Sequence, residues 1–257
     1  MTLPETRPGS VPRSERPPLD YRTDYQSFSR ADRFVVPLLD SRMRELFGKY
    51  AVSTTGPRRA LDVGCGGQPL RPMVEASGYS YASLDTRQNK QGTVDWIACI
   101  DEPLPVGLLS QGPFQFVLCT EVLEHVADWR PAFENLASLM SHGGHLLITC
   151  PFFYPLHEEP HDFWRPTHHA IRHFAGQSGL LVVECARAGS PWDVLGTLLG
   201  AARLRSNDSS LVARMTAKTA AVAQSILYRL LSSKVLHKHV NCDSPLYLSN
   251  VAILTKP

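Results

Sequence analysis

The sequence lacks most of the features that mark secreted, membrane and zinc-ribbon proteins. Its six cysteines include no CxxC pair, which argues against a zinc ribbon or a dithiol redox site. No uninterrupted apolar run reaches the length of a membrane span. The first residues carry no apolar segment of the signal-peptide kind, so we expect a cytoplasmic protein. The formal net charge of +2 gives little reason to expect nucleic acid as a partner.

From residue 58 onward, runs typical of buried strands alternate with runs at helical spacing. The expected strands are 59–63, 79–84, 93–98, 114–119, 145–150, 180–185 and 246–254. The expected helices run up to residue 77, over 129–140 and over 167–177. Strands separated by helices predict a parallel, doubly wound α/β sheet.

The N-terminal part of the chain divides into two segments. Five prolines and few large apolar groups in residues 1–20 predict a disordered tail, which we end at residue 26. Residues 27–56 have apolar groups at helical spacing and form a predicted helical segment. We expect Pro37 to kink or split that helix, because proline removes a backbone donor and clashes with the preceding turn.

Residues 190–240 interrupt the alternation with an amphipathic, basic helical insertion. Apolar residues recur at helical spacing between Leu211 and Leu231. Residues 201–240 contain seven Lys or Arg and one acid, Asp208, a local balance of 7 − 1 = +6. Such a segment suits a lid, a dimer face or an element on a membrane surface, and the plainest alternative is a helix that packs on the domain with a solvated basic face. We expect it to cap the active site or to form a homodimer contact, with peripheral membrane contact as the alternative.

The stretch Ala60-Leu-Asp-Val-Gly-Cys-Gly-Gly67 reads as a buried strand that ends in a glycine turn and opens a helix. Gly64 and Gly66 have no Cβ, so the backbone can approach a ligand closely. Asp85 ends the next expected strand, 21 residues beyond Gly64. A carboxylate there can accept hydrogen bonds from both ribose hydroxyls of an adenosine.

Two familiar phosphate-binding motifs do not fit this turn. A dinucleotide fingerprint would need a third glycine where Pro69 stands, and a P-loop would need a Gly-Lys-Ser/Thr ending, which is absent. Asp62, inside the strand before the turn, instead suits a ligand that carries an amino group and a sulfonium. A tight turn without any ligand is the alternative, which Asp62 and Asp85 at these spacings disfavour.

With these residues, the sequence resembles the class I S-adenosylmethionine methyltransferases. The blocks that match are Leu61-Asp-Val-Gly-Cys-Gly66, Asp85, Phe116-Val-Leu-Cys-Thr-Glu-Val-Leu-Glu-His-Val126 and Gly143-Gly-His-Leu-Leu-Ile-Thr149. The resemblance covers residues 58–185 and the last strand. It implies a Rossmann-like, seven-stranded, mostly parallel sheet with an antiparallel last strand. The core then occupies 57–189, the insertion 190–240 and the last core strand 241–257.

The resemblance also implies roles for individual residues in holding the cofactor, S-adenosylmethionine. The expected cofactor-binding residues are Asp62, Gly64, Cys65, Gly66, Asp85, Asp101 and Glu121. Asp62 and the glycine turn would hold the methionine part, and Asp85 the ribose. The position that usually contacts the adenine amino group aligns with Cys99, so we assign that contact to Asp101.

The segment 150–167 follows the fifth strand and is the expected acceptor side. His157 and His161 have ordinary pKa values near ~6.5 and are the predicted catalytic bases. Asp162 could orient an imidazole; alternatively, Arg165 pairs with Asp162 or Glu159 and the surrounding aromatic residues are core. The block is similar to one in type-11 methyltransferases of bacterial glycan and secondary-metabolite pathways, which implies O-methylation of a small molecule or sugar.

A second interpretation uses the spacing Glu121-x-x-Glu124-His125. On an expected helix after the fourth strand, these side chains share a face and could bind a divalent cation, completed by His157 or His161. Some small-RNA and ubiquinone-pathway O-methyltransferases have a similar motif with a metal, but the same string occurs in metal-free relatives. We therefore assign no metal ligand.

The function expected from the sequence is S-adenosylmethionine-dependent methylation, with a small-molecule or glycan acceptor. A non-catalytic cofactor-binding partner subunit is the alternative from another class, because a fold does not fix a function. A third hypothesis is an RNA methyltransferase, but the chain has no recognisable RNA-binding appendage.

Overall fold

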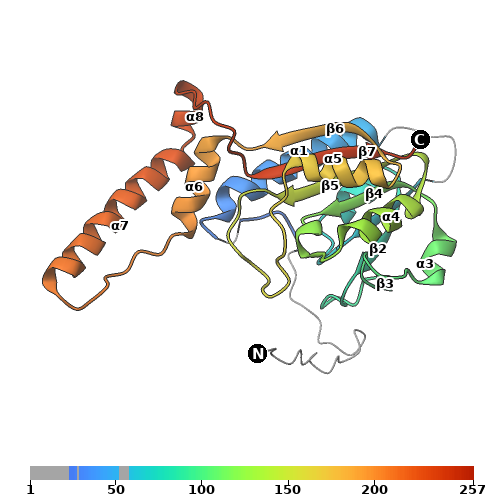
Figure 1. The fold of residues 1–257 in the computed structure, drawn as a ribbon, viewed down its shortest axis with the longest axis horizontal. Coiled ribbons are helices and arrows are strands. Elements are labelled where there is room, and N and C mark those ends of the chain that lie inside the picture. The colour runs from blue at the N-terminus through green and yellow to red at the C-terminus, as the bar shows by residue number, and fades with distance from the viewer. Residues whose placement is uncertain (1–22, 28, 52–57) are drawn as a thin grey trace, which may run out of the picture.

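The computed structural model describes residues 23–27, 29–51 and 58–257 as a seven-stranded sheet flanked by helices (Figure 1). The strand order is β3-β2-β1-β4-β5-β7-β6. All neighbours pair in parallel except β7, which runs antiparallel between β5 and β6. The predicted Rossmann-like, doubly wound, mostly parallel sheet with an antiparallel last strand is therefore confirmed.

The elements are bounded as follows. The strands are β1 Arg59–Val63, β2 Ser80–Asp85, β3 Trp96–Ile97, β4 Phe114–Thr120, β5 Met140–Pro151, β6 Leu181–Ala188 and β7 Ser249–Thr255. The α-helices are α1 Asp32–Tyr50, α2 Arg71–Ala76, α3 Val106–Gln111, α4 Trp129–Leu139, α5 His168–Gln177, α6 Pro191–Ala201, α7 Leu211–Ser232 and α8 Val235–His239, and η2 (Leu123–His125) is a short 3₁₀ helix.

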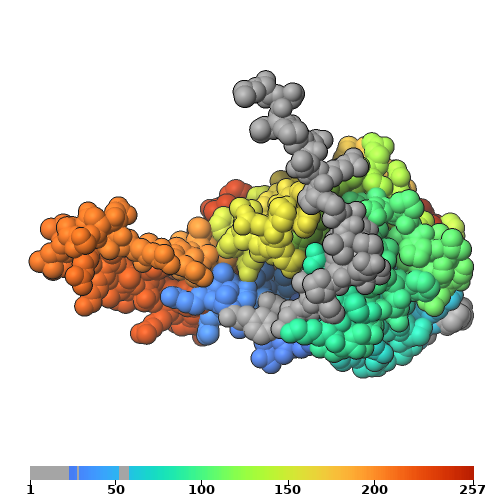
Figure 2. All heavy atoms as spheres, turned by 90° about the horizontal axis from the view of Figure 1, so that it is seen from below, coloured from blue at the N-terminus to red at the C-terminus, as the bar shows by residue number. Residues whose placement is uncertain are grey.

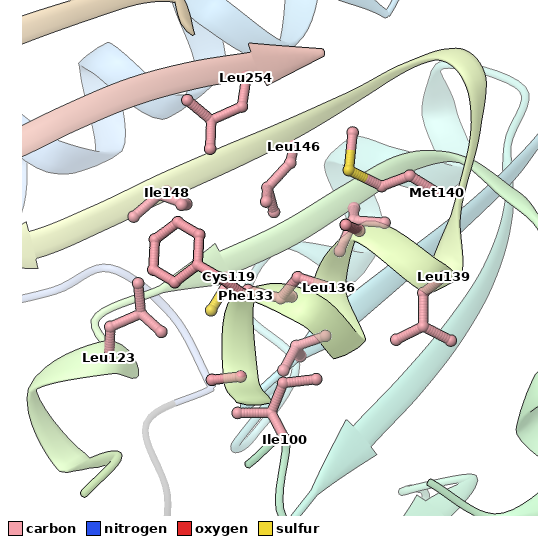
Figure 3. Close-up of a cluster of buried hydrophobic side chains, with 14 of the residues drawn as sticks. Ile100, Cys119, Leu123, Phe133, Leu136, Leu139, Met140, Leu146, Ile148 and Leu254 are labelled. Atoms are coloured by element: carbon pink, nitrogen blue, oxygen red, sulfur yellow. The ribbon is translucent and has the colours of Figure 1, made fainter. Parts of the chain in front are cut away.

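Alternate residues of the central strands pack on two separate apolar cores, one on each side of the sheet. Leu61 of β1 faces the core formed with α4 and α5, whose side chains include Phe133 and Leu136 (Figure 3). Ala60, its neighbour, faces the core on the other side, to which α1 contributes Phe47. This period of two follows from the pleat of a strand. The buried sheet holds the loops at its carboxyl edge in fixed positions.

Several boundaries differ from those predicted. Helix α1 runs through Pro37 without a break, so the expected split is wrong; four buried side chains on either side of the proline hold the helix against the sheet. Strand β3 is shorter than 93–98, because the Asp95 carboxylate accepts the Ser83 backbone N–H at 2.9 Å. Gly143 and Gly144 lie inside β5 instead of before it, and α3 was not expected.

The segment after β4 is also not the predicted helix. Glu121 adopts a left-handed backbone conformation, with φ of 54°, and only Leu123–His125 are helical, as η2. Helix α4 begins at Trp129, where the Asp128 side chain accepts the backbone N–H of Arg130 as an N-cap. The residues 121–125 therefore form a turn at the carboxyl edge of the sheet.

Helices α6 and α7 form an arm that stands out from the sheet domain (Figures 1 and 2). The arm follows β6, and α8 leads the chain back to β7. Tyr228 of α7 anchors it by donating a hydrogen bond to the Arg30 carbonyl at 2.9 Å and packing edge-on against Phe34. Within the described part of the chain, no helix combines the length and apolar character needed to cross a membrane.

Candidate functional site

The glycine turn between β1 and α2 lines a pocket at the carboxyl edge of the sheet. The pocket has a volume of about 110 Å³, and its lining includes Tyr25, Asp62, Gly64, Gly66, Leu70 and Thr120. Gly64 and Gly66 have φ values of 69° and 51°, a region in which L side chains are strained. The Gly64 N–H donates to the Leu84 carbonyl at 2.7 Å, which ties the turn to the end of β2. The turn is thus held open toward the pocket by its backbone.

Asp62 places a buried carboxylate beside this turn. Its Oδ2 accepts a hydrogen bond from the Tyr81 hydroxyl at 2.6 Å. Burial raises the pKa of Asp62 to about 7, against the lowering effect of the Tyr81 hydrogen bond, and the nearby Asp85 adds to the rise. A cationic ligand group in the pocket would favour the ionised carboxylate.

Asp85 lies at the end of β2 and connects to the same turn. Its Oδ2 accepts the Gly66 backbone N–H at 2.8 Å, while the Gly66 carbonyl accepts from Asn89 at 3.0 Å. Burial raises the pKa of Asp85, and hydrogen bonds from the backbone N–H groups of Gly66, Thr86 and Arg87 oppose the rise. Cys65, between the glycines, is buried and lines the pocket, so its predicted cofactor contact stays a prediction; burial raises the pKa of its thiol, which argues against a nucleophilic role.

This arrangement fits the cofactor predicted from the motifs. Two buried carboxylates, Asp62 and Asp85, adjoin a turn whose glycines line the pocket. S-adenosylmethionine carries an ammonium and a sulfonium, which would offset the negative charge, and ribose hydroxyls, which a carboxylate accepts. When bound, it supplies an electrophilic methyl group.

Some residues of the pocket were not found from the sequence. Tyr25 lines it although it falls within the predicted tail, most of which lies outside the described residues; its hydroxyl contacts the Met43 sulfur at 3.8 Å. Residues 23–26 of the predicted tail are thus among the described residues, and Tyr25 packs on α1. Tyr81 follows from the strand period once the register is known. Ser83 is the partner of Asp62 in the sheet, and Tyr81, two residues before Ser83 on β2, therefore lies on the same face as Asp62.

Asp101, the expected adenine contact, lies on the turn after β3. As far as the structure describes the chain, it is not among the residues that line the pocket. Asn135 of α4 holds this turn by donating to the carbonyls of Ile100 and Glu102 at 2.7 and 2.8 Å. The adenine contact stays a prediction.

Glu121 and Glu124 lie on the turn after Thr120, which lines the pocket. The Glu121 N–H donates to the Thr149 carbonyl at 3.0 Å, which holds its left-handed conformation against β5. Glu124 is fully buried, and its Oε1 has no hydrogen-bond partner among the described residues. Burial raises the pKa of Glu124, and the charge of Glu121 raises it further. The turn therefore holds the Glu124 carboxyl group with one oxygen, Oε1, that accepts no hydrogen bond from the described residues.

His125 and His157 complete a cluster around Glu124. One ligand atom from each of the three side chains lies within 4.8 Å of the others. The His125 Nδ1 is 2.7 Å from the His161 carbonyl, which can only accept, so Nδ1 carries a proton and, in the neutral tautomer, the lone pair is on Nε2. That Nε2 lies 3.8 Å from the Glu124 Oε1. The two imidazole rings pack edge to face, with centroids 4.8 Å apart.

The loop 152–167 holds His157 through Asp162 and Arg165. Burial alone would raise the pKa of Asp162, but hydrogen bonds from Arg165, at 2.6 and 2.7 Å, and from the His157 backbone N–H lower it to about 2. The predicted pairing of Arg165 with Asp162 is thus present. Burial lowers the pKa of His157, and the adjacent His125 lowers it further, so its imidazole is neutral at physiological pH.

The structure separates the two predicted bases. His157 lies in the cluster, whereas the His161 side chain is exposed and its ring contacts Phe163. The part that His161 contributes to the cluster is its carbonyl, which orients His125. The aromatic residues also divide: Phe152 stacks on Tyr247 in the interior, while Phe163 and Trp164 are about half exposed.

Comparison with known proteins identifies a family that the chain matches. Residues 31–183, more than half of the chain, match the family model described as methyltransferase domain. The ubiquinone biosynthesis O-methyltransferase of Caulobacter sp. (strain K31) is 32% identical over 100 residues, which are 35% of this chain and 39% of that protein. The enzyme of the same name from Cronobacter sakazakii is 24% identical over 157 residues, 53% of this chain and 64% of that protein. The chain thus spans less than two thirds of these relatives.

Solved structures share the fold at low sequence identity. A SAM-dependent methyltransferase from Archaeoglobus fulgidus has a TM-score of 0.50 at 15% identity, covering 86% of this chain and 94% of that one. The [4+2]-cyclase SpnF has a TM-score of 0.51 at 14% identity, covering 94% and 99%. A fold that also carries a cyclase does not by itself define the reaction. The family match over residues 31–183 shows that the chain belongs to the methyltransferase-domain family, and the sheet order accords with it.

Proposed function

We propose that the protein transfers the methyl group of S-adenosylmethionine to a hydroxyl oxygen of a small molecule or glycan. The observation that carries the proposal is the Glu124–His125–His157 cluster, in which Glu124 and His125 come from the turn after pocket residue Thr120 and His157 comes from the loop after β5. The two relatives named as O-methyltransferases support an oxygen acceptor. Six free cysteines accord with the cytoplasmic location expected from the sequence.

In this proposal, the protein positions the donor and acceptor and removes a proton. Asp62, Asp85 and the glycine turn fix the donor. His157 is the better placed of the two predicted bases, because its lowered pKa leaves a neutral imidazole that can accept the hydroxyl proton. Asp162, held ionised by Arg165, lies 3.3 Å from the His157 Nδ1 and stabilises the imidazolium that forms.

Transfer of a labelled methyl group to a panel of phenols, catechols and sugar alcohols tests this function. We expect His157→Ala to lower turnover by roughly 10²–10⁴-fold while binding of S-adenosylhomocysteine is unchanged. His161→Ala is the matched control and should retain most activity, because the carbonyl that contacts His125 remains. Cofactor binding with transfer to RNA or to no acceptor at all would contradict the proposal.

A second candidate, metal-assisted O-methylation, is favoured by the unsatisfied Oε1 of Glu124. One carboxylate and two imidazoles, with the His125 lone pair already oriented, are a donor set that suits Zn²⁺ or Mn²⁺ better than Mg²⁺. The residues that would hold the ion are Glu124, His125 and His157. A bound cation would offset the negative charge that Glu121 and Glu124 place side by side.

Calorimetric titration of the chelator-treated protein with Zn²⁺, Mn²⁺ or Mg²⁺ separates the two candidates. If the cluster is a metal site, one ion binds per chain, and Glu124→Gln weakens binding by at least roughly tenfold because the anionic ligand is lost. Glu134→Gln, on the exposed side of α4, is the control and leaves the titration unchanged. Full methyl transfer after chelation would contradict the metal-assisted mechanism and support the metal-free one.

A further inference from the structure

One face of α7 exposes a long apolar stripe. Large side chains at helical spacing point to solvent along the helix: Leu211, Val212, Met215, Val222, Ile226 and Leu230. Met215 and Ile226 are 61% and 63% exposed. At 1.5 Å per residue, the stripe extends for roughly 29 Å. Several large apolar side chains exposed on one helix face mark an interaction site.

The protein's own domain does not use this stripe. Helix α7 packs on α6 through its opposite face, where Ala213, Ala217 and Ala221 are partly buried. On that face Gln224 donates to the carbonyls of Leu199 and Ala202 at 2.7 and 2.8 Å. The anchors therefore fix the rotation of α7 so that its larger apolar side chains face outward.

Basic side chains border the stripe on one side. Arg214, Lys218 and Arg229 lie next to it on the helical projection, and all three are exposed. Within residues 201–240, all of which the structure describes, the one acid is Asp208, whose carboxylate accepts the Ser210 N–H at 2.7 Å. Within residues 201–240, therefore, Asp208 is the one carboxylate available to offset the basic border.

The stripe could be covered by a second copy of the chain or by a lipid surface, and the charge pattern favours the lipid surface. Two copies that joined their stripes would bring together two arms with a balance of 7 − 2 = +5 each, where Asp193 and Asp208 are the two acids of Pro191–His239. A surface of anionic lipids accepts both features at once, since acyl chains take up the apolar side chains and headgroups neutralise the basic border. We propose that the arm, Pro191–His239, docks the protein on anionic membranes through the stripe of α7.

The origin of the arm connects docking with the site. Helix α6 leaves β6 at the same edge of the sheet as β5, because both strands are antiparallel to β7. Gly196 and Gly200 of α6 lie so close to Phe34 and Arg30 that a Cβ would collide with them, so the base of the arm is packed tightly on the start of α1. A docked arm thus holds the carboxyl edge of the sheet at a fixed place relative to the lipid surface.

Co-sedimentation with vesicles tests the proposal directly. The intact protein should bind vesicles of phosphatidylcholine mixed with phosphatidylglycerol and not vesicles of phosphatidylcholine alone, and salt should weaken binding. The triple variant Arg214→Gln/Lys218→Gln/Arg229→Gln should lower the partition coefficient roughly fivefold per residue. The variant Met215→Gln/Val222→Gln/Ile226→Gln should lower it at least roughly hundredfold.

The matched control is Val106→Gln/Leu109→Gln, which removes exposed apolar groups from α3, away from the arm. It should bind vesicles like the parent. Circular dichroism and binding of S-adenosylhomocysteine show whether each variant is folded. Equal binding by all variants, or no binding to either vesicle, overturns the proposal. Sedimentation velocity that shows a dimer dependent on Met215, Val222 and Ile226 without vesicle binding assigns the stripe to a second copy.

Discussion

At the residue scale, the protonation of Asp62 should control cofactor affinity. Its pKa is about 7 because burial outweighs the Tyr81 hydrogen bond. A cationic amino group binds the ionised form, so the affinity for S-adenosylhomocysteine should be constant above pH 7 and fall toward tenfold per pH unit below it. Calorimetry between about pH 5.5 and 8 measures this slope.

Two variants separate this effect from ribose binding. Asp62→Asn cannot ionise and should bind weakly with no slope in this range. Asp85→Asn should weaken binding at every pH, because it loses hydrogen bonds to the ribose, and should retain the slope. A parent protein with pH-independent affinity would remove the assigned role of Asp62.

Individual site residues differ in how visible they are in the sequence. Asp62, Gly64 and Gly66 are predictable because a glycine turn after a buried strand has few other uses. Tyr25 is not, because it reaches the pocket through tertiary packing and follows a proline-rich stretch that predicts disorder. The partnership of His125 with the His161 carbonyl is equally invisible, since main-chain contacts leave no residue pattern.

At the scale of elements, the junction of β1 and α2 depends on Gly64. A Cβ at this position would lie 2.2 Å from the Val122 side chain, and the φ of 69° is strained for any L residue. Gly64→Ala should therefore lower the free energy of unfolding by about 3 kcal/mol or more. Gly92→Ala is the matched control, because its φ is 68° but its surroundings are open, and it should cost about 1 kcal/mol.

Denaturant unfolding measures both variants. Val122→Ala in the Gly64→Ala background should restore the part of the loss due to the clash and leave the part due to φ. Equal losses for Gly64→Ala and Gly92→Ala would show that Val122 moves aside without cost.

The strands were more predictable than the turns between them. Strand β4 and the buried part of β5 carry near-continuous apolar runs, which few other structures accommodate. The stretch Glu121–His125 has helical spacing, yet Glu121 takes a left-handed conformation because Thr149 on β5 accepts its N–H. That contact joins residues 28 positions apart, so local patterns could not reveal it.

At the scale of the whole molecule, the protein combines a rigid sheet domain with an arm attached at its base. The two cores bury both faces of the sheet, whereas α7 buries only Tyr228 and Leu231. The sequence predicted the basic helix and its apolar face, but placed that face against the active site or a second subunit. In the structure the apolar face of α7 points outward, and cover by a second copy stays a prediction for the sedimentation experiment.

Hydrogen exchange should reveal this division. Backbone amides of 211–223 should exchange far faster than those of β1 and β4, because local opening of the outer arm exposes few buried contacts. Tyr228→Ala removes the hydrogen bond to the Arg30 carbonyl and the packing on Phe34, so fast exchange should spread to α6 while β1 and β4 keep their protection. Met215→Ala, on the exposed stripe, should change neither. If Tyr228→Ala instead lowered protection in β1 and β4 to the same extent, the arm and the sheet domain would unfold as a single cooperative unit.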